Sequence, residues 1–182
     1  MSQVPEALIS VDIEAAGPSP STGSLLSIGA CLVDDPSVGF YVELRPISEH
    51  PWDDQAETVH GLAREHLERE GLEPAAAMER FAAWVDDACA GRNPIFVGFN
   101  APFDWMFVAD YFWRYLDRNP FGISALDLKS LFMGRNGVTQ WQRTRRIYVD
   151  EALGLETDHN HNALADARGQ ARLARALLNR GQ

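Results

Sequence analysis

Residues 8–14 spell LISVDIE, an apolar run that ends in two carboxylates, Asp12 and Glu14. Pro5 before it and the turn-rich GPSPSTGS after it bound the run as a buried strand. Side chains two positions apart in a strand point to the same face, so we expect Asp12 and Glu14 to project together near its exposed end. Taken alone, the pair is more typical of a strand that simply ends in polar residues. The neighbouring elements therefore decide whether it is part of a functional site.

Acidic side chains follow at two further places where an element begins or ends. Asp104 comes after the apolar run IFVGFN at 95–100, one turn into a helix that Pro102 is suited to open. Asp166 lies at the start of the helical stretch 161–179, five positions after His161. Carboxylates that converge from separate elements repel one another unless cations lie between them, and Mg²⁺ prefers oxygen ligands. We therefore expect a site for two Mg²⁺ or Mn²⁺ ions, with the metal ligands Asp12, Glu14, Asp104 and Asp166.

Simpler interpretations exist for these residues one by one. The helix macrodipole stabilises a carboxylate in a first helical turn by ~0.5 kcal/mol, which would account for Asp104 without a metal. Asn100 is suited to cap the same helix. Because His161 and Asp166 are five positions apart, they do not share one stripe of a helix. We expect His161 on the loop or first turn before the helix, leaning over the metals, and His159 competes for that role.

The remaining apolar runs predict an α/β fold. Strands are expected at 7–13, 24–35, 38–46 and 93–99, with a short fifth strand at 123–128. Helices are expected at 73–91, 101–118, 148–155 and 161–179, and two short ones within 46–73, separated by Gly61. Three strands followed by alternating helices and strands predict a sheet that is parallel on one side and carries an antiparallel hairpin on the other. In such sheets chemistry collects where strands end at a switch in order.

Length and composition limit the class of protein. The chain of 182 residues is most simply one domain, 1–182, and its 46% apolar and 23% charged residues are typical of soluble globular proteins. Cys31 and Cys89 lie in apolar surroundings without metal-ligand or CxxC spacing, so we expect reduced core thiols and a cytoplasmic protein. No apolar stretch has membrane-spanning length, and the first residues lack the pattern of a signal peptide, so no membrane partner is expected.

The charge of the chain is unevenly distributed. The formal net charge of −10 disfavours a surface that coats a nucleic-acid duplex, because phosphate backbones attract basic proteins. Residues 1–128 carry 7 basic and 21 acidic side chains, whereas residues 129–182 carry 9 basic and 5 acidic ones. The densest basic run is QWQRTRR at 140–146, in which Trp141 is either a stacking platform or an anchor for its loop. One positive flank on an acidic protein favours short or single-stranded substrates.

The acidic segments together resemble the three exonuclease motifs of the DEDDh family of 3′→5′ exonucleases, which includes oligoribonuclease, RNase T and polymerase proofreading subunits. VDIE matches the first motif through Asp12 and Glu14, NAPFD matches the second through Asp104, and HNALAD matches the third, H-x-A-x-x-D, through His161 and Asp166. HGLAREHLE at 60–68 resembles the segment that commonly lies between the first two motifs, so the likeness spans about residues 8–175. It implies a ribonuclease H-like fold with a five-stranded mixed sheet, an antiparallel hairpin edge and flanking helices.

The resemblance also implies a chemistry. One metal would be held by Asp12, Glu14 and Asp166, and the second chiefly by Asp12, with Asp104 nearby or acting through water. His161 would be the general base toward a water on the first metal, with Glu14 catalytic beside it. Substrates would be the 3′ ends of single-stranded nucleic acid, RNA or short oligonucleotides rather than DNA, and products nucleoside 5′-monophosphates. Small free-standing relatives are commonly homodimers, and a homodimer is the expectation here.

Residues next to the acidic motifs are expected to bind the substrate: Ala15, Asn100, Phe103 and Trp105. Phe103 and Trp105 flank Asp104 and could stack on a terminal base, although packing of their helix against the core is the commoner role. Family members often carry hydroxyl residues directly after the glutamate of the first motif, where this chain has alanines, so the preference for sugar and base stays open. Asp127 is expected to cap the helix that follows it rather than to bind metal.

Two other functions compete with terminal cleavage. An endonuclease of the ribonuclease H type would also cluster carboxylates, but the H-x-A-x-x-D pattern and the position of Asp104 favour an exonuclease. A catalytically silent nucleic-acid-binding module on the same fold usually loses some of the carboxylates, and none is missing from the motifs here. Circular single strands distinguish the first alternative, and nucleotide release with Mg²⁺ distinguishes the second.

Overall fold

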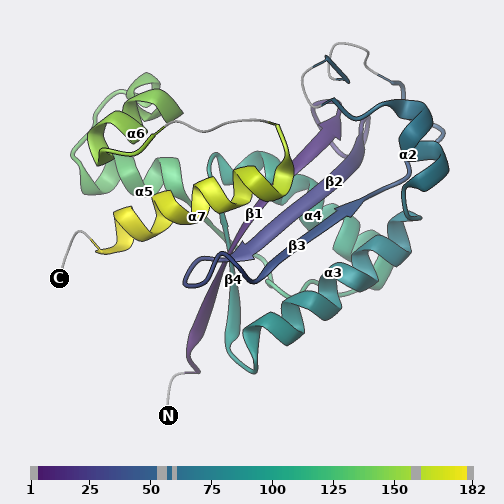
Figure 1. Ribbon diagram of the computed structural model, residues 1–182, viewed down its shortest axis with the longest axis horizontal. Helices are drawn as coiled ribbons and strands as arrows, with labels where there is room; N and C mark the ends of the chain where they lie inside the picture. Colours follow the sequence, from purple (N-terminus) through teal and green to yellow (C-terminus); the bar gives the residue numbers. More distant parts are fainter. Residues whose placement is uncertain (1–3, 53–56, 59–60, 157–160, 180–182) are drawn as a thin grey trace.

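A computed structural model of the chain describes residues 4–52, 57–58, 61–156 and 161–179, and its centre is a five-stranded sheet (Figure 1). The strands are β1 (Glu6–Ala16), β2 (Ser24–Leu32), β3 (Gly39–Glu43), β4 (Asn93–Gly98) and β5 (Ala125–Asp127). The helices are α2 (Arg64–Glu70), α3 (Pro74–Cys89), α4 (Ala101–Leu116), α5 (Leu128–Arg135), α6 (Arg146–Leu153) and α7 (Ala163–Asn179). A 3₁₀ helix, η1 (Trp141–Thr144), lies between α5 and α6 in the chain.

The sheet changes direction at β1. In the order β3-β2-β1-β4-β5, the strand β1 pairs antiparallel with β2 and parallel with β4. The β2–β3 pair is antiparallel and the β4–β5 pair is parallel. The strands β1, β4 and β5 therefore end at the same edge of the sheet, which is the kind of switch point where sites form in α/β folds. The predicted fold class, a mixed sheet with an antiparallel hairpin edge and flanking helices, is confirmed.

The two faces of the sheet bury different helices, because side chains alternate along β1. Ile9 and Val11 are buried in a core shared with α3 and α4. Leu8, on the opposite face, packs in a second core with α5, α6 and α7. On that same face the hydroxyl of Ser10 donates a hydrogen bond to the main-chain oxygen of Ala167, at 2.8 Å. Figure 1 shows α7 crossing the sheet over β1 and β2, with α5 and α6 beside it.

The observed elements differ from the predicted ones mainly in length. The second strand ends at Leu32 because Asp35 accepts hydrogen bonds from the main-chain N–H and the hydroxyl of Ser37 and closes a turn. The fifth strand has 3 residues, since Asp127 caps α5 directly after it. Within 46–73 the structure has α2, while part of the first helix expected there lies outside the described residues. None of the helices in the described ranges is long and apolar enough to cross a membrane.

Candidate active site

Two carboxylates of the candidate site lie on β1, on the face that α7 covers. Asp12 and Glu14 share this face with Ser10, and in the β1–β2 ladder Asp12 lies opposite Gly29. The register shifts between Glu14 and Ala15, so the regular ladder is interrupted directly after the second carboxylate. Interruptions of this kind re-aim the side chains beside them. The structure therefore places both acidic side chains just before the shift in the β1–β2 ladder, where α7 begins to cross the sheet.

The beginning of α7 reaches these carboxylates because β2 has a glycine at the crossing. A Cβ atom built on Gly29 would lie 2.1 Å from the carbonyl carbon of Ala163 and 2.1 Å from the main-chain nitrogen of Leu164. Contacts this short between a side chain and backbone cannot be relieved by a rotamer change. Gly29 thus permits the approach that brings the third motif to the first. Sequence reasoning missed this role, for which the only signal was a glycine inside an otherwise apolar strand.

The third motif meets the first at the start of α7. Asn162 is the N-cap residue, since its side-chain oxygen accepts from the N–H of Ala165 at 3.1 Å and its main-chain oxygen from the N–H of Asp166 at 2.9 Å. His161, one residue earlier, has a φ of 54°, which turns the chain just before the helix. Potential ligand atoms of Glu14, His161 and Asp166 all lie within 4.8 Å of one another. The predicted position of His161 before the helix is confirmed, whereas His159 lies outside the described residues.

The fourth carboxylate comes from α4. Asp104 is buried in the first turn of this helix and accepts a hydrogen bond from the main-chain N–H of Ile13, between the two acidic residues of β1, at 3.2 Å. The start of α4 is itself held by Asp127, whose one oxygen accepts from the N–H of Ala101 at 3.0 Å. The other oxygen of Asp127 accepts from the N–H of Ser130 at 2.9 Å, as the cap of α5. The predicted capping role of Asp127 is confirmed, and its contact with α4 is a second one.

A buried glutamine, which sequence reasoning did not single out, links three elements at the site. Gln170 of α7 is 2% exposed, and its amide nitrogen donates a hydrogen bond to a carboxylate oxygen of Asp12. Its amide oxygen accepts from the main-chain N–H of Phe99, just after β4, at 2.8 Å. This bridge fixes the carboxylate of Asp12 relative to the end of the neighbouring strand. The signal in the sequence was a second polar side chain, besides Asp166, among the small and apolar residues that α7 buries.

Burial and neighbouring negative charge disfavour the ionised forms of two of these carboxylates, Asp12 and Asp104. Burial raises the pKa of Asp12 well above its usual value, and the charges of Asp104, Asp166 and Glu14 raise it further, while Arg146 acts in the opposite direction. Burial also raises the pKa of Asp104 to about 8, against the hydrogen bonds that its carboxylate accepts from main-chain N–H groups. A divalent cation stabilises the ionised forms of such clustered carboxyl groups, because its positive charge offsets the repulsion between them. The residues present fit such ions.

The four residues expected to bind substrate all lie near this edge of the sheet. Ala15 follows the second carboxylate directly, at the shift of register. Asn100 occupies the N-cap position of α4, but its side chain makes no capping bond and instead accepts from the ammonium of Lys129 at 3.2 Å. The ring of Trp105 packs edge-on against Phe96 of β4, with 5.2 Å between centroids. The ring of Phe103, also half-buried, packs against Phe107 at 5.4 Å.

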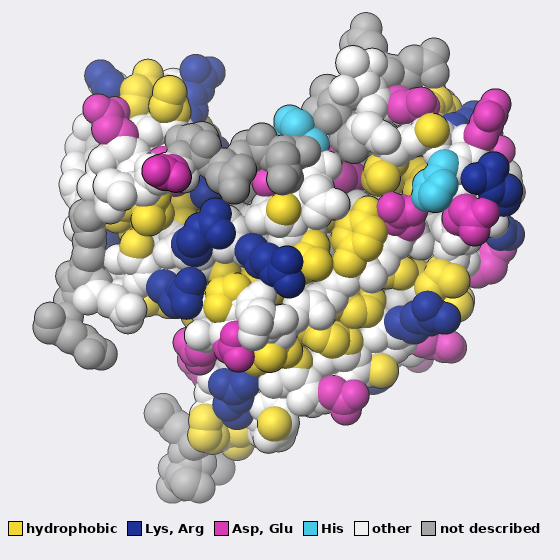
Figure 2. All heavy atoms as spheres, viewed as in Figure 1, with side chains coloured by type: hydrophobic (Ala, Val, Ile, Leu, Met, Phe, Trp, Pro, Cys, Tyr) yellow, Lys and Arg dark blue, Asp and Glu magenta, His cyan; other side chains and the backbone are white. Residues whose placement is uncertain are grey.

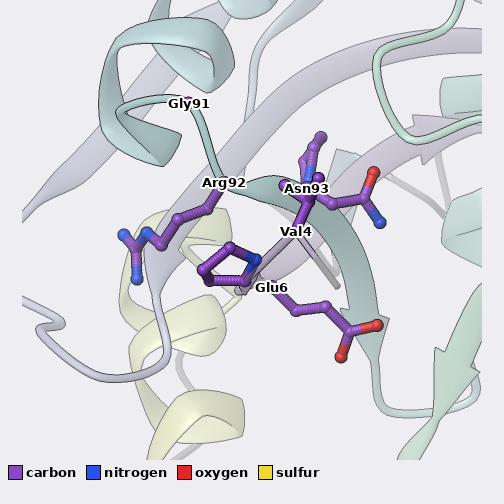
Figure 3. A pocket seen from close by; sticks show the side chains of 7 residues that line it. Val4, Glu6, Gly91, Arg92 and Asn93 are labelled. Carbon is purple, nitrogen blue, oxygen red and sulfur yellow. The ribbon is translucent and has the colours of Figure 1, made fainter. Parts of the chain in front are cut away.

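Basic side chains lie on the α6 and α7 side of the site. Figure 2 shows Lys and Arg side chains in a row along α7, which carries Arg168, Arg172 and Arg175. Arg146 and Arg172 line a hollow of about 410 Å³ between α6 and α7. A second depression, of about 860 Å³, lies at the opposite end of the sheet, where β1 and β4 begin. Its lining includes Glu6 and Arg92, whose side chains extend away from each other (Figure 3), and none of the carboxylates described above.

Comparison with other proteins gives a matching family, a relative similar in sequence, and solved structures with the same fold. The family of 3′-5′ exoribonuclease Rv2179c-like domains matches residues 7–178. The 3′-5′ DNA exonuclease Cap18 of Escherichia coli is 44% identical over 173 residues, which are 94% of this chain and 91% of that protein.

Solved structures with the same fold are much more distant in sequence. The nuclease domain of 3′hExo, a DEDDh family member bound to rAMP, superposes with a TM-score of 0.79 at 15% identity, covering 96% of this chain and 92% of that one. Exonuclease I of E. coli in complex with single-stranded DNA gives a TM-score of 0.77 at 17% identity, covering 97% of this chain and 41% of that one. At these identities the likeness shows the fold.

Proposed function

The chain belongs to the family of 3′-5′ exoribonuclease Rv2179c-like domains, and from this premise we propose that it hydrolyses single-stranded DNA from the 3′ end. The DEDDh assignment made from the three motifs is confirmed, and with it the enzyme class, a 3′-5′ exonuclease that hydrolyses phosphodiester bonds. The kind of nucleic acid, the metal ions and the roles of individual residues are parts of the proposal.

The proposal is carried by the meeting of three motifs at one end of the sheet. Glu14, His161 and Asp166 offer ligand atoms within 4.8 Å of one another, although they lie far apart in the sequence. Asp12 and Asp104 border them closely enough for their charges to act on one another. A cluster of four carboxylates with one imidazole is suited to phosphodiester hydrolysis assisted by metal ions.

The DEDDh family implies a divalent metal, and this donor set suits Mg²⁺ or Mn²⁺. We assign Asp12, Glu14 and Asp166 to one ion, and Asp12 with Asp104 to a second. Ions bound there supply positive charge to the phosphate oxygens and make a bound water more acidic.

The protein side chains then have separate tasks. His161 accepts the proton of the attacking water, because its exposed imidazole stands on the turn before α7, beside Glu14. The cap at Asn162 holds that turn in place, since it fixes the first residues of α7. Gln170 holds one oxygen of Asp12, which leaves the carboxylate a single orientation toward the site. Glu14, whose carboxylate lies within 4.8 Å of a ring nitrogen of His161, helps to orient the same water.

The choice of DNA rests on the residues that follow the first motif and on the relative from E. coli. Ala15 and Ala16 offer no side-chain partner to the 2′-hydroxyl of a ribose, so this segment gives a protein no means to prefer RNA through that group. The relative with 44% identity acts on DNA by its name. The sequence alone had favoured RNA, and that preference is now the second candidate. The family's description as exoribonucleases supports it.

A digestion panel tests the proposal. Single-stranded DNA labelled at the 5′ end, RNA of the same sequence, a DNA duplex and a circular single strand are incubated with Mg²⁺, with Mn²⁺ and with chelator. We expect shortening of the linear DNA from its 3′ end, release of nucleoside 5′-monophosphates, an intact circle and no reaction with chelator. Faster shortening of RNA would select the second candidate. Cutting of the circle would instead indicate an endonuclease, and no release from any strand a silent binding module.

A further inference from the structure

We propose that Trp141 and Lys129 form a platform that binds the single strand on the 5′ side of the scissile bond, with a base stacked on the indole and a phosphate beside the ammonium. This inference rests on the proposed function and names a second contact surface for the same substrate. The 3′-terminal nucleotide must lie at the carboxylates, and nothing continues beyond it. Any further contact with the strand is therefore on its 5′ side.

Trp141 is both exposed and anchored. Its residue is 48% exposed at the first position of η1. The turn is fixed from beneath, because the hydroxyl of buried Thr144 donates to the main-chain oxygen of Trp141 at 2.7 Å. A large aromatic ring held at the surface by a short, tied turn presents a stacking face at little entropic cost. Base stacking on such rings is typical of proteins that bind single strands.

Lys129 connects this ring to the active-site edge of the sheet. Its ammonium lies 4.3 Å from the centroid of the Trp141 ring and donates a hydrogen bond to the side-chain oxygen of Asn100 at 3.2 Å. Asn100 is the residue before α4, whose first turn carries Asp104. The indole and the start of α4 are therefore held by one ammonium group. The platform is one side chain away from the helix that contributes a carboxylate to the site.

The charges around the platform are not neutralised by the protein. Lys129, Arg143 and Arg145 form no ion pair with a carboxylate among the described residues, whereas Arg146 is paired with the buried Asp150 at 2.8 Å. The guanidinium of Arg143 instead lies over the ring of Tyr148, 4.9 Å from its centroid. Cations with aromatic rings between them match the alternation of phosphates and bases along a single strand. A loop anchor alone would explain the ring contact with Lys129, but not the three cations left without carboxylate partners.

Trp113 offers a matched control that separates the effect of base stacking on Trp141 from the effect of removing any exposed tryptophan. Trp113 is also 48% exposed, but it lies on α4 nine residues after Asp104, about 13 Å farther along the helix axis. It stands next to Arg114, which is paired with Asp110 at 2.7 Å. Trp113→Ala therefore serves as the control variant for Trp141→Ala.

The first experiment compares substrates of two lengths. We expect Trp141→Ala to lower the ratio of kcat/KM for a DNA dodecamer to kcat/KM for a dinucleotide by roughly 5- to 140-fold, the effect of losing one stacked base. Trp141→Phe should restore most of the ratio, and Trp113→Ala should leave it unchanged. An unchanged ratio in Trp141→Ala, or equal losses on both substrates, would overturn the platform. If the unsubstituted protein cleaves neither substrate with Mg²⁺ or Mn²⁺, the proposed function fails instead.

The second experiment needs no substitution, because Lys129 is the only lysine of the sequence. An amine-specific acetylating reagent can modify only this side chain and the α-amino group, which is the internal control. With Ca²⁺ and a DNA dodecamer whose last linkage is a phosphorothioate, we expect acetylation of Lys129 to slow several-fold, as measured by mass spectrometry. The α-amino group should react at the same rate with and without the DNA. An unprotected Lys129 in a complex whose formation is verified by fluorescence anisotropy would refute the phosphate contact.

Discussion

At the scale of single residues, Asp12 is where the electrostatics of the site converge. Its pKa is raised first by burial and then by the charges of Asp104, Asp166 and Glu14. The hydrogen bond from Gln170 at the same time holds one of its oxygens in place. A carboxylate held in a fixed position against like charges is costly to ionise without a cation and favourable to ionise with one. We therefore expect the same geometry to weaken the metal-free site and to favour the binding of a divalent cation there.

Asp12→Asn is expected to abolish nucleotide release, since it removes the charge that we assign to both ions. The asparagine oxygen can still accept from Gln170, so the fold should persist. Release of nucleotides from a labelled strand measures the activity, and calorimetry with Mn²⁺ measures ion uptake. Asp86→Asn, at an exposed carboxylate paired with Arg118 on the surface, is the control and should keep full activity. Robust cleavage by purified Asp12→Asn would contradict the assignment of two ions.

His161→Ala is expected to slow turnover by roughly 10²–10⁴-fold, the contribution of one general base. Uptake of Mn²⁺ should change little, because the carboxylates remain. His66→Ala is a suitable control, since this exposed histidine of α2 contacts Glu43 at 2.8 Å and takes no part in the cluster. If His161→Ala lost the ions as well as the turnover, the imidazole would be a metal ligand rather than the base.

At the scale of elements, the site depends on how closely α7 approaches the sheet. Three of its contacts with the sheet lie near the site: the glycine of β2 under its first turn, the hydroxyl of Ser10 at Ala167, and the side chain of Gln170 toward the end of β4. Only the first turn carries motif residues, yet all three contacts set its position. A change in any of them should act on the chemistry through the placement of Asp166.

Gly29→Ala tests this dependence directly. The added Cβ would lie 2.1 Å from backbone atoms of α7, so the helix must move outward. Overpacking of this kind lowers the free energy of unfolding by about 1–3 kcal/mol, and we expect activity to fall with it. Gly134→Ala is the control: no atom lies within 4 Å of its Cβ position, and alanine at this place in α5 should be neutral or slightly stabilising. Chemical unfolding and nucleotide release measure the two effects. A fully active Gly29→Ala protein would show that the approach is not needed.

Gln170→Met is expected to lower the free energy of unfolding by about 1–3 kcal/mol, because the N–H of Phe99 is left without its acceptor. Apparent affinity for Mn²⁺ should fall by about 10–100-fold, as when the partner that orients a metal ligand is lost. Gln170→Glu keeps an acceptor for the N–H of Phe99, so it should recover part of the lost stability. It also places a negative charge beside Asp12, so the carboxyl group of Asp12 should ionise still less readily in the metal-free protein. Unchanged Mn²⁺ affinity in Gln170→Met would restrict this residue to a packing role.

At the scale of the whole molecule, charge is divided between two regions. The chain carries a net charge of −10, yet its basic residues are concentrated after residue 128, on α5, η1, α6 and α7. The acidic cluster lies at the edge of the sheet next to this basic region. Under the proposed function, we expect a nucleic-acid strand to approach along the positive flank and to present its last phosphodiester to carboxylates whose charge bound cations would neutralise.

The stability of the whole fold should depend on pH and metal in a defined direction. The pKa of Asp104 rises from 3.8 to about 8 on folding, so the folded state holds a proton that the unfolded chain releases. The contribution of this group to stability is greatest at low pH and falls as the pH rises from about 4 to about 8. In the absence of metal, the Tm of Asp104→Asn should therefore exceed that of the unsubstituted protein by more at pH 8 than at pH 5.

Addition of Mn²⁺ gives the matching measurement. Ions that bind only the folded state raise the Tm, and they should do so more at pH 8 than at pH 5, because protons compete for the carboxylates at the lower pH. Asp104→Asn should show a smaller rise. A Tm that does not respond to Mn²⁺ or Mg²⁺ at pH 8 would contradict the metal site as a whole.

The sequence by itself determined the order of the five strands, the helices from α2 on apart from η1, and the identity of the acidic motifs. Alternation along residues 8–14, the proline that opens α4 and the spacing of His161 and Asp166 are local features. Local conformational preferences are sufficient to interpret them. The same reasoning placed His161 on the turn before its helix and Asp127 as a cap, both as the structure has them.

The tertiary structure alone decided how these elements approach one another. The glycine under α7, the glutamine bridge from Asp12 to Phe99 and the ammonium between Trp141 and Asn100 join residues that are remote in the chain. Such contacts arise from packing and from the need to satisfy buried polar groups, and these depend on all elements at once. No local pattern carries that information, because each residue of such a pair is ordinary until the fold supplies its partner.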